Sequence, residues 1–132
     1  MNRHVWAFLL AGGVCFCTPA ADADQFKCGG TEPFWDLQIS ESEMQLRDMS
    51  GDSFDKVIKL VPTPAERARG TAEDFVRVYR TKIAGQDNEP VTVVLQKSDS
   101  SECSDDMSEK QYAYYAIVIT RQFVLRGCCE KK

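Results

Sequence analysis

The sequence predicts an all-β protein: a small antiparallel barrel stapled by disulfide bonds, with a β-sandwich as the alternative. Short segments in which apolar and polar residues alternate recur along the chain, with turn-forming residues between them. After the first 23 residues the sequence has no long helical pattern, and four cysteines remain. Several short strands at regular spacing are typical of a barrel or a sandwich, and small exported domains are often stapled by disulfides.

The first 23 residues have the pattern of a secretory signal peptide. A positive start at Arg3 is followed by an apolar run over residues 5–17 and by small residues that end at Ala23. The apolar run is too short to span a bilayer. We therefore expect a signal peptide over residues 1–23 and a single barrel-like domain over residues 24–132, in the periplasm or outside the cell.

Two cysteines of the signal region raise the question of a lipid anchor. The residue before a lipid-bearing cysteine is normally small, whereas Val14 precedes Cys15 and Phe16 precedes Cys17. We therefore expect no lipid anchor, and no stable membrane insertion once the signal has been removed.

The cysteines that remain after signal removal are even in number and are expected to form two disulfides in an oxidising compartment; they are Cys28, Cys103, Cys128 and Cys129. Neighbouring residues of a strand point to opposite faces, so Cys128 and Cys129 are expected to reach different partners. We favour a bond from Cys28 to one of them and from Cys103 to the other. Which partner each takes stays open.

The expected strands follow one another along the chain as alternating segments at residues 25–28, 35–39, 44–47, 54–61, 73–83, 91–97, 112–120 and 123–128. Gly29 and Gly30 are expected to turn the chain after the first strand. Residues 65–70 and the polar stretch 98–110 are expected to be loops, and a tight turn at Arg121 and Gln122 joins the last two strands.

The positions of the cysteines favour the barrel over the sandwich. The first and last strands each carry cysteine, and a bond between them would help to hold the sheet edges. An immunoglobulin-like sandwich usually has its bridge between two central strands, and Cys28 lies too near the start of the expected domain for that.

One absence in the sequence argues against common enzyme classes. The only histidine is His4, inside the expected signal peptide. The exported chain therefore lacks the base of Ser-His-Asp and Cys-His catalysis and the usual imidazole ligands of zinc. We expect no enzyme, no cofactor and no metal site, and the sequence nominates no catalytic residue.

Four residues are candidates for recognition of another molecule: Glu32, Phe34, Trp35 and Asp105. An exposed Phe-Trp pair is the kind of anchor that interfaces use, but a strand sends Phe34 and Trp35 to opposite faces. We expect Trp35 to fill the core and Phe34 to lie near the surface. In that case Phe34 is the better binding candidate.

An acidic loop follows the sixth expected strand and contains Asp99, Glu102, Asp105, Asp106 and Glu109. The loop lacks the spacing of a known calcium loop, so we favour a solvated loop in which Asp105 and Ser108 bond to nearby backbone. Nucleic acid is not an expected partner, because the formal net charge is −4 and the basic residues around Arg77 and Arg80 form no stripe with interleaved aromatics.

Three motifs in order resemble those of a family of small, largely uncharacterised bacterial envelope proteins: CGGTEPFW at residues 28–35, CSDDMS at residues 103–108 and GCC at residues 127–129. The resemblance implies a secreted or lipid-anchored β domain and implies no reaction. Asp106 stands where the family pattern leads us to expect glycine, and Arg121-Gln122 stands where we expect an Asn-Gly-like turn.

These observations favour a non-catalytic envelope module that binds a cationic protein or peptide, for example a wall-degrading enzyme that it inhibits. One alternative is a barrel carrier of a small apolar ligand that uses the aromatic residues Phe34, Trp35, Tyr79, Tyr114 and Tyr115. A weaker alternative is a hydrolase that uses paired carboxylates such as Glu32 and Asp36. The sequence does not indicate an oligomeric state.

Overall fold

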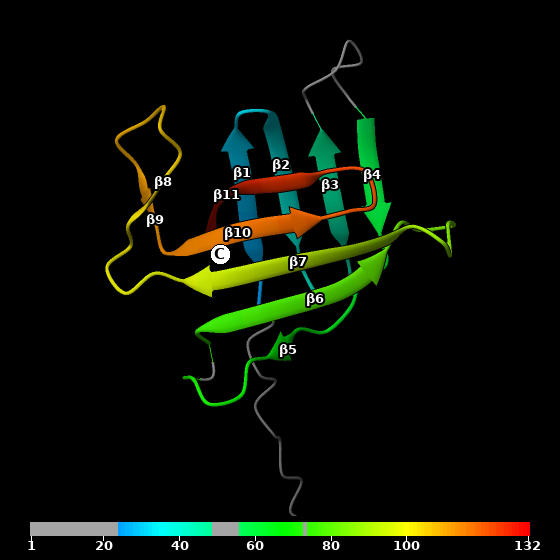
Figure 1. Ribbon diagram of the computed structural model, residues 1–132, viewed down its shortest axis with the longest axis horizontal. Helices are drawn as coiled ribbons and strands as arrows, with labels where there is room; N and C mark the ends of the chain where they lie inside the picture. Colours follow the sequence, from blue (N-terminus) through cyan, green and yellow to red (C-terminus); the bar gives the residue numbers. More distant parts are fainter. Residues whose placement is uncertain (1–23, 49–55, 73) are drawn as a thin grey trace, which may run out of the picture.

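The alternation of apolar and polar residues places one face of each main strand inside a curled antiparallel sheet (Figure 1). The computed structural model describes residues 24–48, 56–72 and 74–132. The expected signal peptide lies outside these residues, as do the first residues of two expected strands, at positions 54–55 and 73.

The strands are short, as the spacing of the turn residues predicts. They are β1 (Phe26–Thr31), β2 (Phe34–Ile39), β3 (Met44–Asp48), β4 (Lys56–Leu60), β5 (Glu66–Arg67), β6 (Val76–Lys82), β7 (Pro90–Lys97), β8 (Cys103–Ser104), β9 (Gln111–Tyr112), β10 (Tyr114–Ile119) and β11 (Val124–Lys131).

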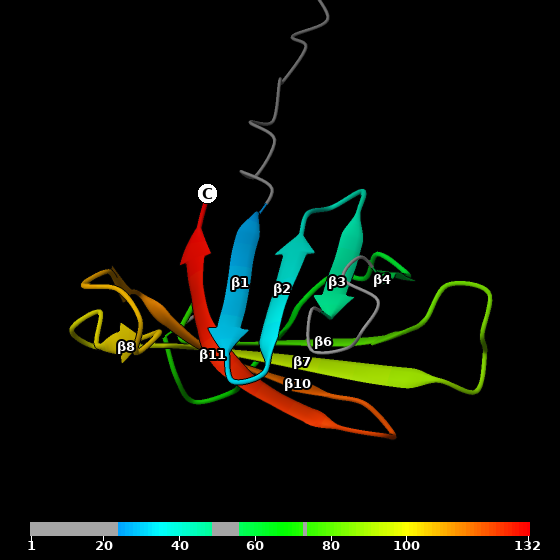
Figure 2. The ribbon, with the colours of Figure 1, turned by 90° about the horizontal axis from the view of Figure 1, so that it is seen from above.

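Nine of these strands form one sheet in the order β4-β3-β2-β1-β11-β10-β7-β6-β5, and β8 and β9 form a separate two-stranded ribbon. All pairings are antiparallel. The long strand β11 lies at the corner: its residues 124–129 pair with β10, and its residues 128–131 pair with β1. As a result, β1 to β4 run across the direction of β6, β7 and β10 (Figures 1 and 2).

The two sides of the curled sheet meet where β4 ends. Leu60 forms a β-bridge with Ile83, and the backbone N–H of Val61 donates to the carbonyl of Lys82 at 3.0 Å. The N–H of Ala84 donates to the carbonyl of Lys59 at 2.8 Å. The curled all-β sheet is a half-barrel, which confirms the predicted fold class. The bonds between residues 59–61 and residues 82–84 close one side of it in part.

Two disulfides staple the barrel from opposite faces of β11. Cys129 bonds to Cys28, its cross-strand neighbour in β1, and Cys128 bonds to Cys103 at the start of the β8–β9 ribbon. This confirms that Cys28 and Cys103 each take one of the adjacent pair. The bridges span sequence separations of 101 and 25. In the chain-entropy description such loops are worth about 4–5 and about 3–4 kcal/mol.

Three details of the expected strands were wrong. Gly29 and Gly30 lie within β1 and do not turn the chain; the turn is at Glu32 and Pro33. The segment 65–70 contributes the short edge strand β5, and the polar stretch 98–110 contributes β8. Strands this short have too few residues to show alternation, so the pattern could not reveal them.

The core lies between the two halves of the curled sheet and is formed by alternate residues of its strands: Phe26, Cys28, Trp35, Leu37, Ile39, Met44, Leu46, Leu60, Tyr79, Val91, Val93, Leu95, Tyr114, Ala116, Val118, Leu125 and Cys129. In residues 24–48, 56–72 and 74–132 there is no helix with the length and hydrophobicity of a membrane span.

A cation lies among these apolar side chains. Arg77 is 2% exposed; its Nε donates to Asp24 at 3.0 Å, and its Nη1 donates to the Asp74 carbonyl at 3.0 Å and to the Tyr114 hydroxyl at 3.3 Å. The guanidinium carbon also lies 5.0 Å from the centre of the Phe26 ring. Burial opposes the charged form, but the bonds to Tyr114 and Asp24 outweigh it and raise the pKa of Arg77.

Candidate interaction surface at the β1–β2 turn and the β8–β9 loop

The turn from β1 to β2 separates its two aromatic residues, as the strand geometry predicts. Trp35 is 2% exposed, whereas Phe34 is 48% exposed. Trp35 therefore belongs to the core, and Phe34 is the aromatic residue that another molecule can reach. The third candidate of this turn, Glu32, is exposed as well.

Two glycines make room for the Trp35 ring. A Cβ on Gly30 would lie 2.3 Å from Nε1 of Trp35, and a Cβ on Gly127 would lie 2.7 Å from its ring and 2.1 Å from the Gly29 carbonyl oxygen. The same Nε1 donates to the carbonyl of Arg126 at 3.3 Å. Glycine is therefore required at these two positions for close approach of the indole.

The loop between β8 and β9 is organised by Asp105. The Oδ1 atom accepts hydrogen bonds from the backbone N–H groups of Met107 and Ser108 at 3.1 and 2.8 Å, and Oδ2 accepts one from the Tyr112 hydroxyl at 3.1 Å. The Ser108 hydroxyl also bonds to both oxygens. The backbone bonds from Ser108 and Met107 are the main cause that lowers the pKa of Asp105 to about 2.

These bonds confirm the expected local network of Asp105 and Ser108, and they change the role of Asp105. A carboxylate that already accepts from four groups holds the loop in shape and has little capacity left for a partner. The neighbouring Asp106 has a φ of 60°, a conformation that glycine adopts freely. Glycine would therefore take the place of Asp106 without a change of backbone conformation.

One hydrogen bond joins the turn to the loop. The Thr31 hydroxyl donates to the backbone carbonyl of Asp105 at 2.9 Å, and both segments extend from the same end of the molecule (Figure 1). The Cys103–Cys128 bridge ties the base of the ribbon to β11. The turn and the loop therefore form one surface.

We call this the tip surface and define it by five exposed residues: Glu32, Phe34, Asp106, Met107 and Glu109. Met107 is 68% exposed. Among the residues that the structure describes, the three carboxylates of the tip surface have no ion-pair partner. Sequence reasoning missed Met107, because the polar stretch around it gave no sign that an apolar side chain would be left in solvent.

A small cleft of about 230 Å³ lies behind the tip surface, next to β1, and contains the carboxylates of Asp36, Asp105 and Glu130. Each carboxylate already has a partner. Asp36 faces Arg47 at 3.9 Å, and Glu130 accepts from Lys110 at 2.8 Å and from Lys132 at 2.7 Å. Hydrogen bonds from these two lysines lower the pKa of Glu130 to about 2.

The structure does not bring Glu32 and Asp36 together. Glu32 lies on the exposed turn, whereas Asp36 pairs with Gly29, three residues before the turn on the neighbouring strand. At about 3.3 Å per residue this separates the two positions by about 10 Å along the hairpin. In the described ranges, His, Cys, Asp and Glu side chains form no group of three that could hold a metal ion.

Most of the aromatic residues expected to line a carrier cavity lie in the core. Trp35, Tyr79 and Tyr114 are buried there. Burial also raises the pKa of Tyr79 to about 12. Tyr115 is half-buried on the outer face and Phe34 belongs to the tip surface.

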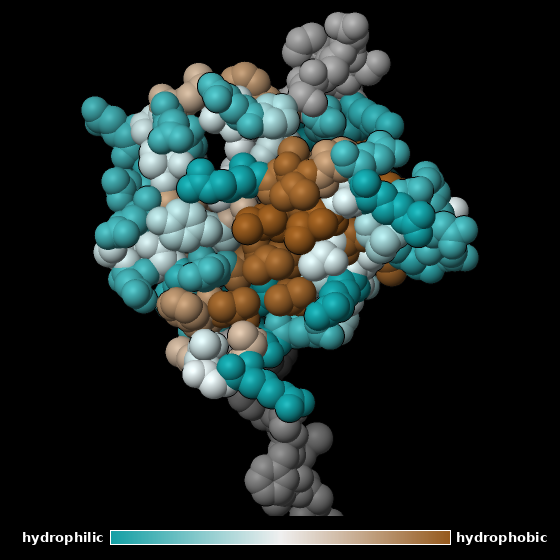
Figure 3. Space-filling model, in the orientation of Figure 1, coloured by the Kyte–Doolittle hydropathy of each residue, from teal (hydrophilic) through white to brown (hydrophobic). Residues whose placement is uncertain are grey.

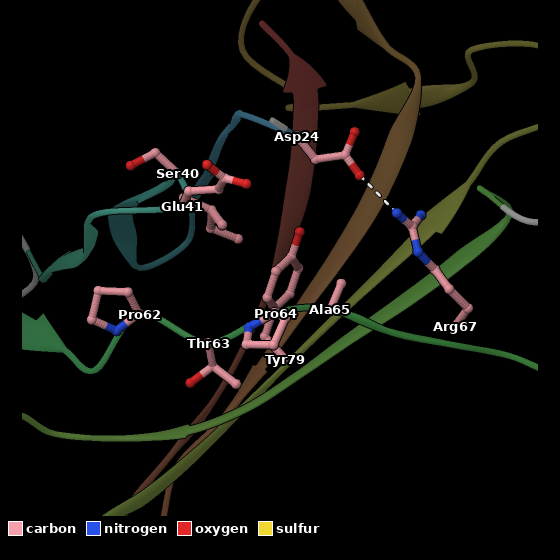
Figure 4. Close-up of a pocket in the computed structure, with 10 residues that line it drawn as sticks. Asp24, Ser40, Glu41, Pro62, Thr63, Pro64, Ala65, Arg67 and Tyr79 are labelled. Atoms are coloured by element: carbon pink, nitrogen blue, oxygen red, sulfur yellow. Dashed lines mark hydrogen bonds and ion pairs between the residues drawn. The ribbon is translucent and has the colours of Figure 1, made fainter. Parts of the chain in front are cut away.

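Two larger clefts lie away from the tip surface. One, of about 550 Å³, is at the opposite end of β1 and has Ser40 and Glu41 on one side and the Asp24–Arg67 ion pair on the other (Figure 4). The second, of about 640 Å³, lies at the mouth of the barrel beside β4 and is partly lined by Leu46, Ile58, Ile83, Val91 and Phe123.

Comparison with protein families, with curated proteins and with solved structures gives no significant match to this chain.

Proposed function

We propose that this protein is a non-catalytic module of the periplasm or cell envelope that binds a cationic protein or peptide through the tip surface. The observation that carries the proposal is the pair of exposed apolar side chains, Phe34 and Met107, among three carboxylates that have no ion-pair partner in the part of the chain that the structure describes. Aromatic and methionine side chains surrounded by polar groups are typical of interface centres.

The construction of the tip surface supports a binding role. Phe34 follows a turn whose next residue, Trp35, is fixed in the core, and the loop is held by Asp105 and by its bond to Thr31. A surface that is already ordered loses little conformational entropy on binding. The formal net charge of −4 would also attract a cationic partner over distance.

Binding of lysozyme, used as a cationic probe, tests the proposal by titration calorimetry at low and at high salt. Phe34→Ala should weaken binding by about tenfold, as loss of an interface anchor does. Val57→Ala is the matched control, because Val57 is 40% exposed on β4, outside the tip surface. Binding should also weaken at high salt, because salt screens exposed charges.

Two double variants test how much the carboxylates of the tip surface contribute to binding. Glu32→Gln with Asp106→Asn should weaken binding, whereas Glu41→Gln with Glu89→Gln removes the same charge elsewhere and should leave it nearly unchanged. Absence of binding, or equal losses in the two double variants, would show that the tip surface does not bind cations.

The barrel-mouth cleft supports a second candidate function, the carrier of a small apolar ligand. Its floor is apolar, with Leu46 and Val91 each 1% exposed, and its volume of about 640 Å³ suits a small molecule. The fluorescent probe 1-anilinonaphthalene-8-sulfonate should bind there, and Phe123→Glu should abolish the signal. Gln38→Glu, at an exposed position of β2 outside the cleft, is the control; equal loss in both variants would exclude the cleft as the binding site.

A further inference from the structure

An apolar patch covers the outer face of the sheet, away from the tip surface and from the clefts. We call it the outer patch and define it by Val76, Val78, Val94, Ile117, Ile119 and Val124. Figure 3 shows hydrophobic side chains gathered on this face, over β6, β7, β10 and β11. All six side chains are half-buried or exposed, and none belongs to the core.

The strand register makes the outer patch continuous. Ile117 pairs with Val94, and Val94 pairs with Val78, so three apolar residues form a row across β10, β7 and β6. Ile119 pairs with Val124 beside this row. A contiguous apolar surface of this kind on a soluble protein generally marks an interaction site.

The ends of the row carry opposite charges. Ile117 pairs with Arg126 on β11, and Val78 pairs with Glu66 on β5. Across the sheet the row therefore reads Arg126, Ile117, Val94, Val78, Glu66, with Val94 at its centre. At about 4.8 Å between strands, the row is about 19 Å long.

We propose that the outer patch is the interface of a symmetric dimer, in which it packs against the same patch of a second copy of this chain. Two sheets that pack face to face keep their strands within about 30° of each other. A two-fold axis that lies between the sheets and runs along β7 reverses the row. It places Val94 against Val94, Ile117 against Val78 of the partner, and Arg126 against Glu66 of the partner.

The charges favour a second copy over an unrelated partner. Arg126 has no ion-pair partner among the described residues, and Arg80 bonds only to Oε2 of Glu66, at 2.7 Å. The other Glu66 oxygen can therefore accept from Arg126 of a second copy. The same reversal that pairs the apolar residues also pairs these charges, which is the self-complementarity that a two-fold interface requires.

The outer patch also lacks the carboxylates that would make two copies of an acidic protein repel each other. The outward residues of β6, β7 and β10 include no carboxylate, and those of β11 include none between residues 124 and 128. Two copies with a formal net charge of −4 each can therefore approach here with little repulsion between nearby carboxylates.

Sedimentation velocity of the exported, unreduced protein over a wide concentration range tests the proposal. The wild type should form a dimer, and Val94→Asp should be a monomer because it places two carboxylates against each other at the axis. Gln38→Asp, which adds the same charge at an exposed position of β2, should remain a dimer. Circular dichroism and the melting temperature show that each variant is folded.

A charge exchange tests the axis itself. Arg126→Glu and Glu66→Arg should each raise the dimer dissociation constant by about tenfold or more, and the double variant should return it to within a few-fold of the wild type. A protein that stays monomeric at all concentrations, a dimer that survives Val94→Asp, or a double variant without rescue would each overturn the proposal.

Discussion

Two carboxylates at opposite ends of β1 each gather several donors, but they do so in different ways. Asp24 accepts from Arg67 at 2.9 Å, from Arg77 at 3.0 Å and from Lys131 at 2.8 Å. Those cations come from β5, β6 and β11, far away in the sequence. The donors to Asp105 are hydroxyl and backbone groups within seven residues.

Asp24 therefore stabilises contacts between strands, whereas Asp105 stabilises a single loop. Asp24 joins three strands and neutralises a buried cation, so its loss should affect the whole barrel. Burial favours the neutral form of Asp24, but the bond from Lys131 and the charges of Arg77 and Lys131 outweigh this and lower its pKa. Asp105 shapes a loop that lies outside the main sheet, so its loss should be felt locally.

The largest effect is expected for Asp24→Ala. This variant leaves Arg77 buried without its counter-ion, which should lower the free energy of unfolding by about 3 kcal/mol. Arg67→Ala removes a partner of Asp24 that is itself partly exposed, and should cost less than about 1 kcal/mol. Urea unfolding of the unreduced protein, followed by tryptophan fluorescence, measures both values. Equal losses would show that the burial of Arg77 does not matter.

A smaller, local effect is expected when Asp105 is protonated. Its pKa lies at about 2, below the ordinary value of 3.8. A lowered pKa means that the stabilisation is fully present above about pH 4 and is lost as the pH falls towards 2. The amide signals of Met107 and Ser108 should therefore titrate in this range by NMR.

Asp105→Asn supplies the control for this titration. The variant should abolish the acid titration of the Met107 and Ser108 amides, and Trp35 should stay buried in both proteins, because the loop is not part of the core. A global unfolding of Asp105→Asn near neutral pH would contradict the local role.

The features predicted from sequence depend on local rules. Cys128 and Cys129 are neighbours on a strand, so they had to face opposite sides, and the same rule separates Phe34 from Trp35. Alternation over four or more residues predicted the main strands and the barrel. Neither inference required any knowledge of which strands pair.

The missed features depend on contacts between distant residues. Arg77 alternates with apolar neighbours like a core residue, but its burial depends on Asp24, which is 53 positions earlier in the chain. The glycines of the first motif predict a turn, whereas in the structure Gly30 lies against the Trp35 ring and the Arg126 carbonyl of another strand. Such requirements become visible only once the register is known.

The smallest effect on stability is expected at Asp106, which lies in the β8–β9 loop and also belongs to the tip surface. Asp106 has a φ of 60°, and Ser101 has a φ of 54°. Asp106→Gly and Ser101→Gly should each relieve strain and raise the free energy of unfolding. The gain should be only about 0.5 kcal/mol, because the added freedom of glycine in the unfolded chain offsets part of it.

Only Asp106→Gly removes a carboxylate of the tip surface, so only this variant should bind lysozyme more weakly. Equal binding by the two variants would mean that Asp106 takes no part in recognition.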